Sequence, residues 1–233
     1  MFKRILIVLV VIIAGFVAFA ATRPGSYRVE RSAKIDAPAA VVFAQLEDLK
    51  AWSAWSPWEG KDPLMTKTFE GPAKGVGAAY TWQGNDKVGE GKMTITDSRP
   101  PSNLKLRLEF IKPFAAVATT ELTVQPDSAG SSSVLWAMEG TNNLIAKMFG
   151  LFMNMDTMIG NDFDKGLAAL KQLAESETRK QEAAAAGAKA AADAAVAAAA
   201  EKAKAEEAAK AAAAAAAAAK ESEAKKKGKK KKR

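Results

Sequence analysis

Residues 48–59 read DLKAWSAWSPWE and place three of the chain's five tryptophans within seven residues. The segment follows a short amphipathic helix, predicted over Pro38–Leu46, and precedes a series of short strands. Tryptophan is costly to expose and hard to bury completely, because its large ring carries one polar N–H group. Trp52, Trp55 and Trp58 therefore indicate either a packed plug at a helix-to-sheet corner or the rim of an apolar cavity.

The hydrophobic pattern around this segment predicts an α+β domain. Tyr27–Asp36 alternates apolar and polar residues, as a half-buried strand does. Apolar residues at three- and four-residue spacing predict one long helix over Asn142–Glu177. Between them, turn signals separate six further predicted strands, Leu64–Glu70, Gly77–Gly84, Val88–Asp97, Asn103–Lys112, Ala116–Gln125 and Ser132–Gly140. Successive short turns imply an antiparallel meander, so we expect a curved seven-stranded sheet around the C-terminal helix.

Composition divides the 233-residue chain into an N-terminal segment (1–24), a central domain (25–177) and a tail (178–233). The net charge of +8 lies in the tail, which holds 15 basic and 7 acidic residues. The other 177 residues hold 19 of each sign. The domain therefore has no electrostatic basis for binding nucleic acid, and specific nucleic-acid binding is not expected.

The chain contains neither cysteine nor histidine. Disulfides, thiolate nucleophiles, Ser-His-Asp triads and histidine or cysteine metal sites are therefore excluded. Carboxylate, lysine, tyrosine and arginine chemistry remains, or no chemistry at all. We expect no metal site and no cofactor.

Ile5–Ala21 is an unbroken apolar run behind Lys3 and Arg4. As a helix it would reach about 26 Å, close to the thickness of the apolar part of a bilayer. The positive residues favour a single-pass anchor in the inner, cytoplasmic membrane, with the N-terminus inside and the domain facing the periplasm or outside. The alternative is a signal peptide cleaved near Ala20, which would secrete the domain.

Several short motifs occur in a particular order along Tyr27–Glu177. They are Ile35-Asp36-Ala37-Pro38 with Val42-Phe43, Asp48-Leu49 with Trp52, Trp55, Ser56 and Pro57, Gly75-x-Gly77 with Tyr80 and Trp82, Gly89-Glu90-Gly91, Trp136-x-Met138-x-Gly140, Asp162-Phe163, and Gly166-Leu167-x-x-Leu170. Together they resemble the START-like (SRPBCC) superfamily and its polyketide cyclase/dehydrase and lipid-transport branch. The resemblance implies a helix-grip fold with a cavity between the sheet and the long helix. It does not imply one activity, because carriers, cyclases and regulators share this scaffold.

Strand alternation and helix spacing then suggest which side chains would bind a ligand in that cavity, the alternative being that they only fill the core. The candidates are Trp58, Tyr80, Trp82, Leu108, Phe110, Trp136 and Met138, opposed from the long helix by Met148, Phe152, Met155 and Ile159. Methionine-rich faces adapt to apolar ligands of varied shape.

Glu90 is the polar candidate, because two flanking glycines would let another group approach it closely. The competing interpretation puts Glu90 on a solvated strand face beside a β-bulge. We expect no catalytic residue; if the domain is an enzyme, Glu90 and Tyr80 are the first candidates.

Alanine dominates the tail, so it is predicted to be helical or disordered, without an apolar face for a core. It ends in Lys225–Arg233, where eight of nine residues are basic, and such a run binds polyanionic surfaces such as those of the cell envelope. The leading hypothesis is a membrane-anchored, non-catalytic carrier of a lipid or other hydrophobic small molecule. The alternatives are a cyclase- or dehydratase-like enzyme using a cavity carboxylate, or an envelope scaffold acting through its basic tail.

Overall fold

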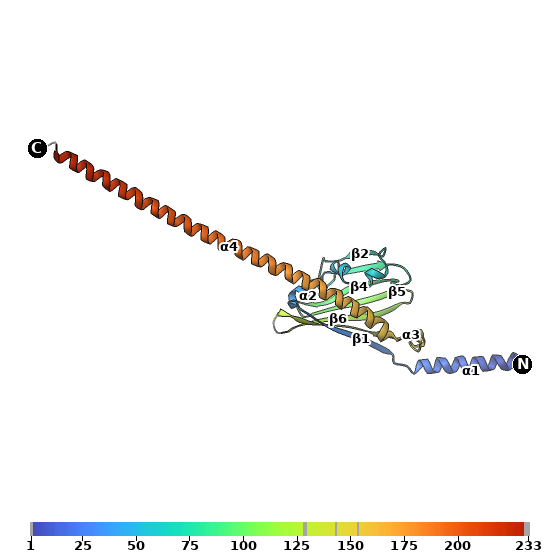
Figure 1. The fold of residues 1–233 in the computed structure, drawn as a ribbon. Helices are drawn as coiled ribbons and strands as arrows, with labels where there is room; N and C mark the ends of the chain where they lie inside the picture. The colour runs from blue at the N-terminus through green and yellow to red at the C-terminus, as the bar shows by residue number, and fades with distance from the viewer. Residues whose placement is uncertain (1, 128–129, 143, 153, 231–233) are drawn as a thin grey trace. The chain divides into compact units, whose positions relative to one another are not determined.

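The computed structural model describes residues 2–127, 130–142, 144–152 and 154–230. Its centre is a seven-stranded antiparallel sheet with the order β1-β7-β6-β5-β4-β3-β2 (Figure 1). The strands are β1 (Ser26–Ile35), β2 (Thr66–Glu70), β3 (Ala79–Gln83), β4 (Glu90–Arg99), β5 (Asn103–Lys112), β6 (Ala116–Pro126) and β7 (Ser132–Thr141). The helices are α1 (Phe2–Ala21), α2 (Ala39–Glu47), α3 (Leu144–Phe149) and α4 (Met155–Lys230), with short 3-10 turns η1 (Ala51–Ala54) and η2 (Glu59–Lys61). The predicted α+β helix-grip arrangement is confirmed.

Alternating residues of the strands form one wall of the core. Leu104, Leu106 and Leu108 of β5 are buried, as the period-two pattern of that strand predicts. The first part of α4 lies along the same face of the sheet (Figure 1) and buries Phe163, Leu167, Leu170 and Ala174 at helical spacing. Burying one large aliphatic or aromatic side chain contributes about 1.5–3 kcal/mol, so this shared apolar layer holds the helix on the sheet.

The tryptophan segment closes the end of α2. Trp52 donates its indole N–H to the carbonyl oxygen of Leu46 at 2.9 Å, and Trp55 donates to that of Gln45 at 3.3 Å. The last carbonyls of a helix have no partner within the helix, so the two indoles satisfy groups that would otherwise be buried without one. Both rings are buried, and these two tryptophans therefore form the packed plug.

Trp136 of β7 lies at the centre of the aromatic packing. Its ring stacks on Phe163 of α4 with centroids 4.2 Å apart and an interplanar angle of 8°. Edge contacts join it to Trp52 at 6.2 Å, Trp55 at 5.5 Å and Trp58 at 5.9 Å. The sheet, the tryptophan segment and α4 therefore meet at one side chain.

The predicted single helix Asn142–Glu177 is wrong, because the chain forms α3 and α4 with a break between them. Asn154 explains the restart: its side-chain oxygen accepts a hydrogen bond from the backbone N–H of Thr157 at 3.1 Å, as an N-cap residue does. Gly150, a poor helix former, follows α3 directly. The break changes the direction of the apolar residues that precede α4.

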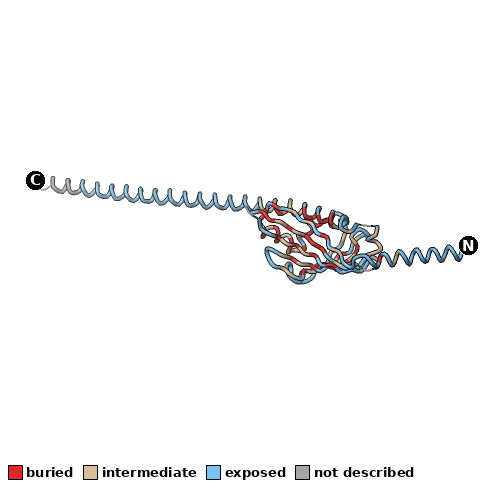
Figure 2. The backbone as a smooth tube through the Cα atoms, turned by 90° about the horizontal axis from the view of Figure 1, so that it is seen from below, coloured by how far each residue is buried: buried red, intermediate tan, exposed pale blue. Residues whose placement is uncertain are grey.

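Two helices, Phe2–Ala21 and Met155–Ser222, are long and apolar enough to cross a membrane by length and composition. α1 is an N-terminal apolar helix of the kind that acts as an anchor or as a signal sequence. The second helix owes its apolar character to alanine, and no residue of its most apolar 18-residue stretch is buried. Figure 2 shows buried residues gathered in the strands and the facing helix, with residues 179–222 of the tail exposed.

The chain divides into two compact units, Met1–Arg179 and Lys180–Arg233. The second unit is the tail, which is helical as far as Lys230, so of the two predicted states the structure has the helix. Val196 is its single large apolar side chain among the described residues and is exposed. The last three residues of the basic run Lys225–Arg233 lie outside the described residues.

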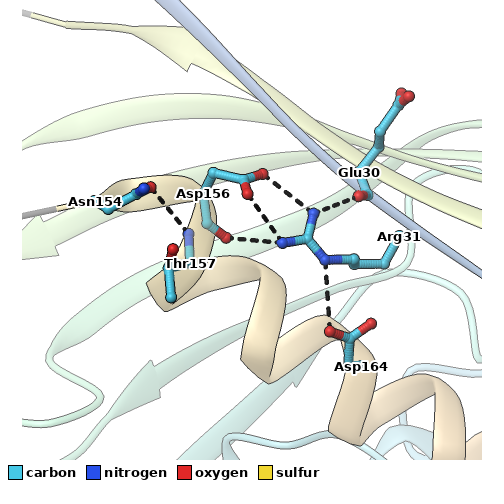
Figure 3. A network of polar contacts seen from close by, with 6 residues as sticks. All are labelled: Glu30, Arg31, Asn154, Asp156, Thr157 and Asp164. Atoms are coloured by element: carbon cyan, nitrogen blue, oxygen red, sulfur yellow. Dashed lines mark hydrogen bonds and ion pairs between the residues drawn. The ribbon is translucent and has the colours of Figure 1, made fainter.

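Arg31 of β1 ties the start of α4 to the edge of the sheet (Figure 3). Its guanidinium contacts both carboxylate oxygens of Asp156, at 3.1 and 3.0 Å, and the backbone oxygen of Asp156 at 3.2 Å. It also lies 3.5 Å from the carboxylate of Asp164, which is about two helical turns further along α4. Gly160 leaves the space for this side chain, since a Cβ there would lie 2.0 Å from the guanidinium.

The pairing predicts a pH dependence. The hydrogen bond from Arg31 lowers the pKa of Asp156 below its ordinary value. The stabilisation is therefore complete above the unfolded pKa of about 3.9 and is lost as the pH falls through the lower folded pKa. We expect Asp156→Asn to flatten the fall in melting temperature below about pH 4, measured by near-ultraviolet circular dichroism, which reports aromatic packing. Asp193→Asn in the exposed tail is the control, and an equally steep fall in both variants would contradict the assignment.

Candidate functional site

A cavity of about 440 Å³ lies between the sheet and the first turns of α4. Strands β3 to β7 form one wall, and the segment containing η2 and the start of α4 form the other. Its size falls within the range of small-molecule sites, which are commonly about 300–1,000 Å³. The helix-grip arrangement thus leaves part of its interior unfilled.

Most of the lining is apolar, and nine of the eleven side chains predicted to face a ligand lie on it. These are Trp58, Tyr80, Trp82, Leu108, Phe110, Trp136, Met138, Met155 and Ile159. Both roles suggested for the tryptophan segment occur: Trp55 belongs to the plug, Trp52 belongs to the plug and also lines the cavity, and the half-buried Trp58 forms part of the cavity wall.

Met148 and Phe152 do not line the cavity, which corrects their predicted placement. Met148 belongs to α3, and Phe152 lies in the break before α4. Phe152 is 80% exposed, and its ring lies 6.0 Å from that of Phe16 in α1. The physical reason is the helix restart at Asn154, which interrupts the face that these residues would share with Met155 and Ile159.

Glu90 also lies off the cavity, contrary to the enzyme hypothesis. Its carboxylate pairs with the ammonium group of Lys112 at 2.6 Å on the neighbouring strand, and the pairing register shifts between Glu90 and Gly91. The glycine at position 91 makes room for Trp82 and not for a ligand at Glu90, because a Cβ at Gly91 would lie 2.4 Å from the indole ring of Trp82. The interpretation of a strand face beside a bulge is the correct one.

Tyr80 lies on the cavity wall, buried between the rings of Phe69 and Trp82. Burial, with a smaller contribution from the charge of Glu59, raises the pKa of Tyr80 well above its ordinary value. The hydroxyl therefore keeps its proton at neutral pH. It can donate a hydrogen bond to a bound molecule, but it is a poor general base.

The charged part of the lining was not predicted. Lys61 of η2 forms an ion pair with the buried carboxylate of Asp162 on α4, and Lys67 of β2 pairs with Glu59. Glu59, Lys61 and Asp162 all line the cavity. The sequence held one signal, since Asp162-Phe163 is part of the family-like pattern, but nothing in it paired Asp162 with Lys61.

Two buried polar atoms on residues of the sheet wall stand out. Among the described residues, neither the hydroxyl oxygen of Thr120 nor the indole nitrogen of Trp136 has a hydrogen-bond partner. A buried polar group left in this state costs about 1–3 kcal/mol. Both residues line the cavity, although these two atoms are themselves covered by other atoms of the wall.

The charged residues of the cavity do not form a metal site. Among the described residues, no group of three or more acidic side chains comes together in a way that could hold a metal ion. The arrangement is suited to enclosing an apolar molecule, with the hydroxyl of Tyr80 and the lysine–carboxylate pairs as its polar features.

Comparison with known proteins places the fold in context. Residues 26–175 match the family model described as "Polyketide cyclase / dehydrase and lipid transport". A search of the curated proteins gives no significant match.

Several solved structures are similar to this chain. A crystal structure from Chromobacterium violaceum is 16% identical and covers 66% of this chain and 99% of its own, with a TM-score of 0.47. A solution structure from Thermobifida fusca is 21% identical and covers 63% and 92%, with a TM-score of 0.48. The Aha1 dimer from Colwellia psychrerythraea is 13% identical and covers 64% and 96%, with a TM-score of 0.46.

Proposed function

The chain belongs to the polyketide cyclase/dehydrase and lipid transport family, and we propose that its domain binds a lipid or another hydrophobic small molecule and carries it without chemical change. The observation that carries the proposal is the apolar cavity of about 440 Å³ between the sheet and α4. An empty apolar space of this size lacks the dispersion contacts that a packed core would make. A ligand that fills it regains those contacts and removes its own apolar surface from water.

The composition of the wall supports a flexible preference among apolar ligands. Met138, Met155 and Met158 line the cavity from opposite sides. Unbranched thioether side chains adopt many conformations at low cost, so such a wall accommodates acyl or ring structures of different shape. The hydroxyl group of Tyr80 is available to orient one polar group of the ligand.

The ion pairs formed by the two carboxylates of the cavity support a carrier function rather than a catalytic one. Glu59 and Asp162 are each held by a lysine, Lys67 and Lys61 respectively. Each carboxylate is therefore already engaged in a charge-assisted contact within the wall and is not free to act on a bound molecule. The two ion pairs are better suited to fixing the wall of a binding site.

The proposal extends to location. α1 would anchor the domain in the inner membrane with its N-terminus in the cytoplasm, because Lys3 and Arg4 precede the apolar run. The basic end of the tail would then associate with polyanionic surfaces outside that membrane. A signal peptide cleaved near Ala20 remains the competing arrangement for the N-terminal segment.

Filling the cavity provides the test. The full chain, reconstituted in nanodiscs, would be titrated with a fluorescent fatty acid and a short-chain fluorescent phospholipid. We expect saturable binding that Ile159→Trp weakens at least about tenfold, because the larger ring occupies ligand volume and tenfold corresponds to about 1.4 kcal/mol. Val196→Trp in the exposed tail is the matched control. Saturable binding with the same affinity in both variants would show that the ligand binds outside the cavity. No binding of either probe would refute the carrier proposal.

A further inference from the structure

The cavity has a mouth, and its position can be read from the exposure of the lining residues. Most of them are buried or half-buried, but Lys87, Phe114 and Met158 are exposed. Phe114 is 57% exposed and Met158 49% exposed. Lys87 lies in the turn between β3 and β4, Phe114 in the turn between β5 and β6, and Met158 in the first turn of α4. These three side chains therefore mark where the interior meets the outside.

Strand register places these turns at one end of the sheet. Glu90, the first residue of β4, pairs with Lys112, the last residue of β5, so the two turns are neighbours. Ala118 near the start of β6 pairs with Gly140 near the end of β7. The same end of the sheet therefore holds both turns and the exit of β7 into α3 and α4.

The N-terminal helix arrives at this same end. Ser26, the first residue of β1, pairs with Thr141, the last residue of β7, and only residues 22–25 separate β1 from α1. Contacts agree with the connectivity: the ring of Phe16 lies 6.0 Å from that of Phe152, and Lys147 of α3 donates a hydrogen bond to the carbonyl oxygen of Ala21 at 3.3 Å. The membrane-type helix thus ends beside the mouth.

Exposed apolar side chains gather at this end of the sheet. We define the mouth rim as six exposed large hydrophobic residues, chosen among those that the structure describes, on the β5–β6 turn and its flanks and on the segment from α3 to the first turn of α4. They are Ile111, Phe114, Val117, Leu144, Phe152 and Met158. At the opposite end of the sheet, the β4–β5 turn is described in full and exposes no large hydrophobic side chain. Apolar residues clustered on a surface in this way mark an interaction site.

We propose that the mouth rim inserts into the lipid–water interface of the membrane that holds α1, so that a lipid passes between bilayer and cavity without crossing water. The surface that covers the rim is the bilayer, because α1 is an apolar helix long enough to span a bilayer. Only four residues separate α1 from β1. Lys147 and Arg23 lie beside the rim, where basic side chains suit the headgroup region. The lipid uptake rests on the proposed carrier function, and the insertion of the rim rests on the proposed anchoring of the domain by α1.

The absence of native cysteine makes the insertion measurable at single sites. Phe114→Cys and Phe152→Cys on the rim, and Ser102→Cys on the opposite β4–β5 turn, would each carry one environment-sensitive fluorophore. The full chain would be reconstituted in vesicles of phosphatidylcholine and phosphatidylglycerol containing lipids with a nitroxide near the headgroup. We expect quenching to remove on the order of half of the signal at the two rim sites, because interfacial groups sit within about 5–10 Å of the headgroup boundary. Equal, weak quenching at all three sites would overturn the proposal.

A second measurement tests uptake with rim residues that do not line the cavity. Ile111→Asp combined with Phe152→Asp is expected to slow transfer of a fluorescent phospholipid from vesicles to the protein about tenfold, while a water-soluble fluorescent fatty acid binds with unchanged affinity. Val76→Asp, at an exposed valine in the turn between β2 and β3 away from the rim, is the control and should leave the rate unchanged.

The two measurements separate the two ideas. Rim quenching without any ligand binding supports the insertion and removes the carrier function. Ligand binding without rim quenching leaves the carrier function intact and overturns the insertion. An unchanged transfer rate in the double variant, with rim quenching present, overturns the direct route between bilayer and cavity.

Discussion

Replacing Trp136 by alanine is expected to lower the free energy of unfolding by about 3–5 kcal/mol, the range for large aromatic residues in cores. The ring is buried, stacks on Phe163 at 4.2 Å and contacts Trp52, Trp55 and Trp58 by its edges. Deletion therefore loosens the sheet, the tryptophan segment and α4 together. Denaturant unfolding followed by near-ultraviolet circular dichroism measures the change, because the helical tail does not contribute to that signal.

Two further variants sharpen this result. Trp136→Phe keeps an aromatic ring and removes the indole N–H, which has no partner among the described residues, so its cost should be clearly smaller. Val196→Ala in the exposed tail should leave the transition unchanged within about 0.5 kcal/mol, as surface changes generally do. A Trp136→Ala variant as stable as Val196→Ala would contradict the central role of this side chain.

Gly166→Ala is expected to destabilise the domain although alanine is the better helix former. A Cβ at this position would lie 2.8 Å from the ring of Trp136 and 3.0 Å from Cδ of Pro57. Trp136 cannot move aside, because Phe163 stacks on it from the same helix. Overpacking of this kind costs about 1–3 kcal/mol, and the gain in helix propensity of at most about 1 kcal/mol offsets only part of it.

Gly187 offers the matched comparison on the same helix. No heavy atom lies within 4 Å of a Cβ built there, so Gly187→Ala should leave the unfolding of the domain unchanged and raise the helix content of the tail. Thermal scans in the near and far ultraviolet separate the two effects. If Gly166→Ala and Gly187→Ala behaved alike, the close approach of α4 to the sheet would be refuted.

Most of the strands were predictable because one face is buried and the other is not; β2, which buries neither face, is the exception. β5 illustrates this: the predicted bounds Asn103–Lys112 are those observed, and Leu104, Leu106 and Leu108 all face the core. The helix break was missed for the opposite reason. Residues 142–177 keep an apolar spacing across the break, and spacing alone does not show that Asn154 caps a new helix. Phe152 was therefore assigned to a face that the chain does not form.

The apolar wall of the cavity was predicted through the same alternation, whereas its charged part was not. Glu59 and Lys61 lie in η2, a three-residue 3-10 turn. It is too short for a repeating hydrophobic pattern to indicate where its side chains point. Lys61 and its partner Asp162 are 101 residues apart, and a single sequence contains no signal for such a pairing. Glu90 was misplaced because glycine neighbours mark either a bulge or a close approach, and the group that approaches Gly91 is the ring of Trp82.

The distribution of the tryptophans has an optical consequence. All five belong to the domain: Trp52, Trp58, Trp82 and Trp136 line the cavity, and Trp55 touches two of them. Neither α1 nor the tail contains one. The intrinsic emission of the whole chain therefore originates within a few ångströms of the ligand space, where excitation can migrate among neighbouring rings. The protein carries a built-in reporter whose colour and lifetime reflect the polarity of one enclosed volume.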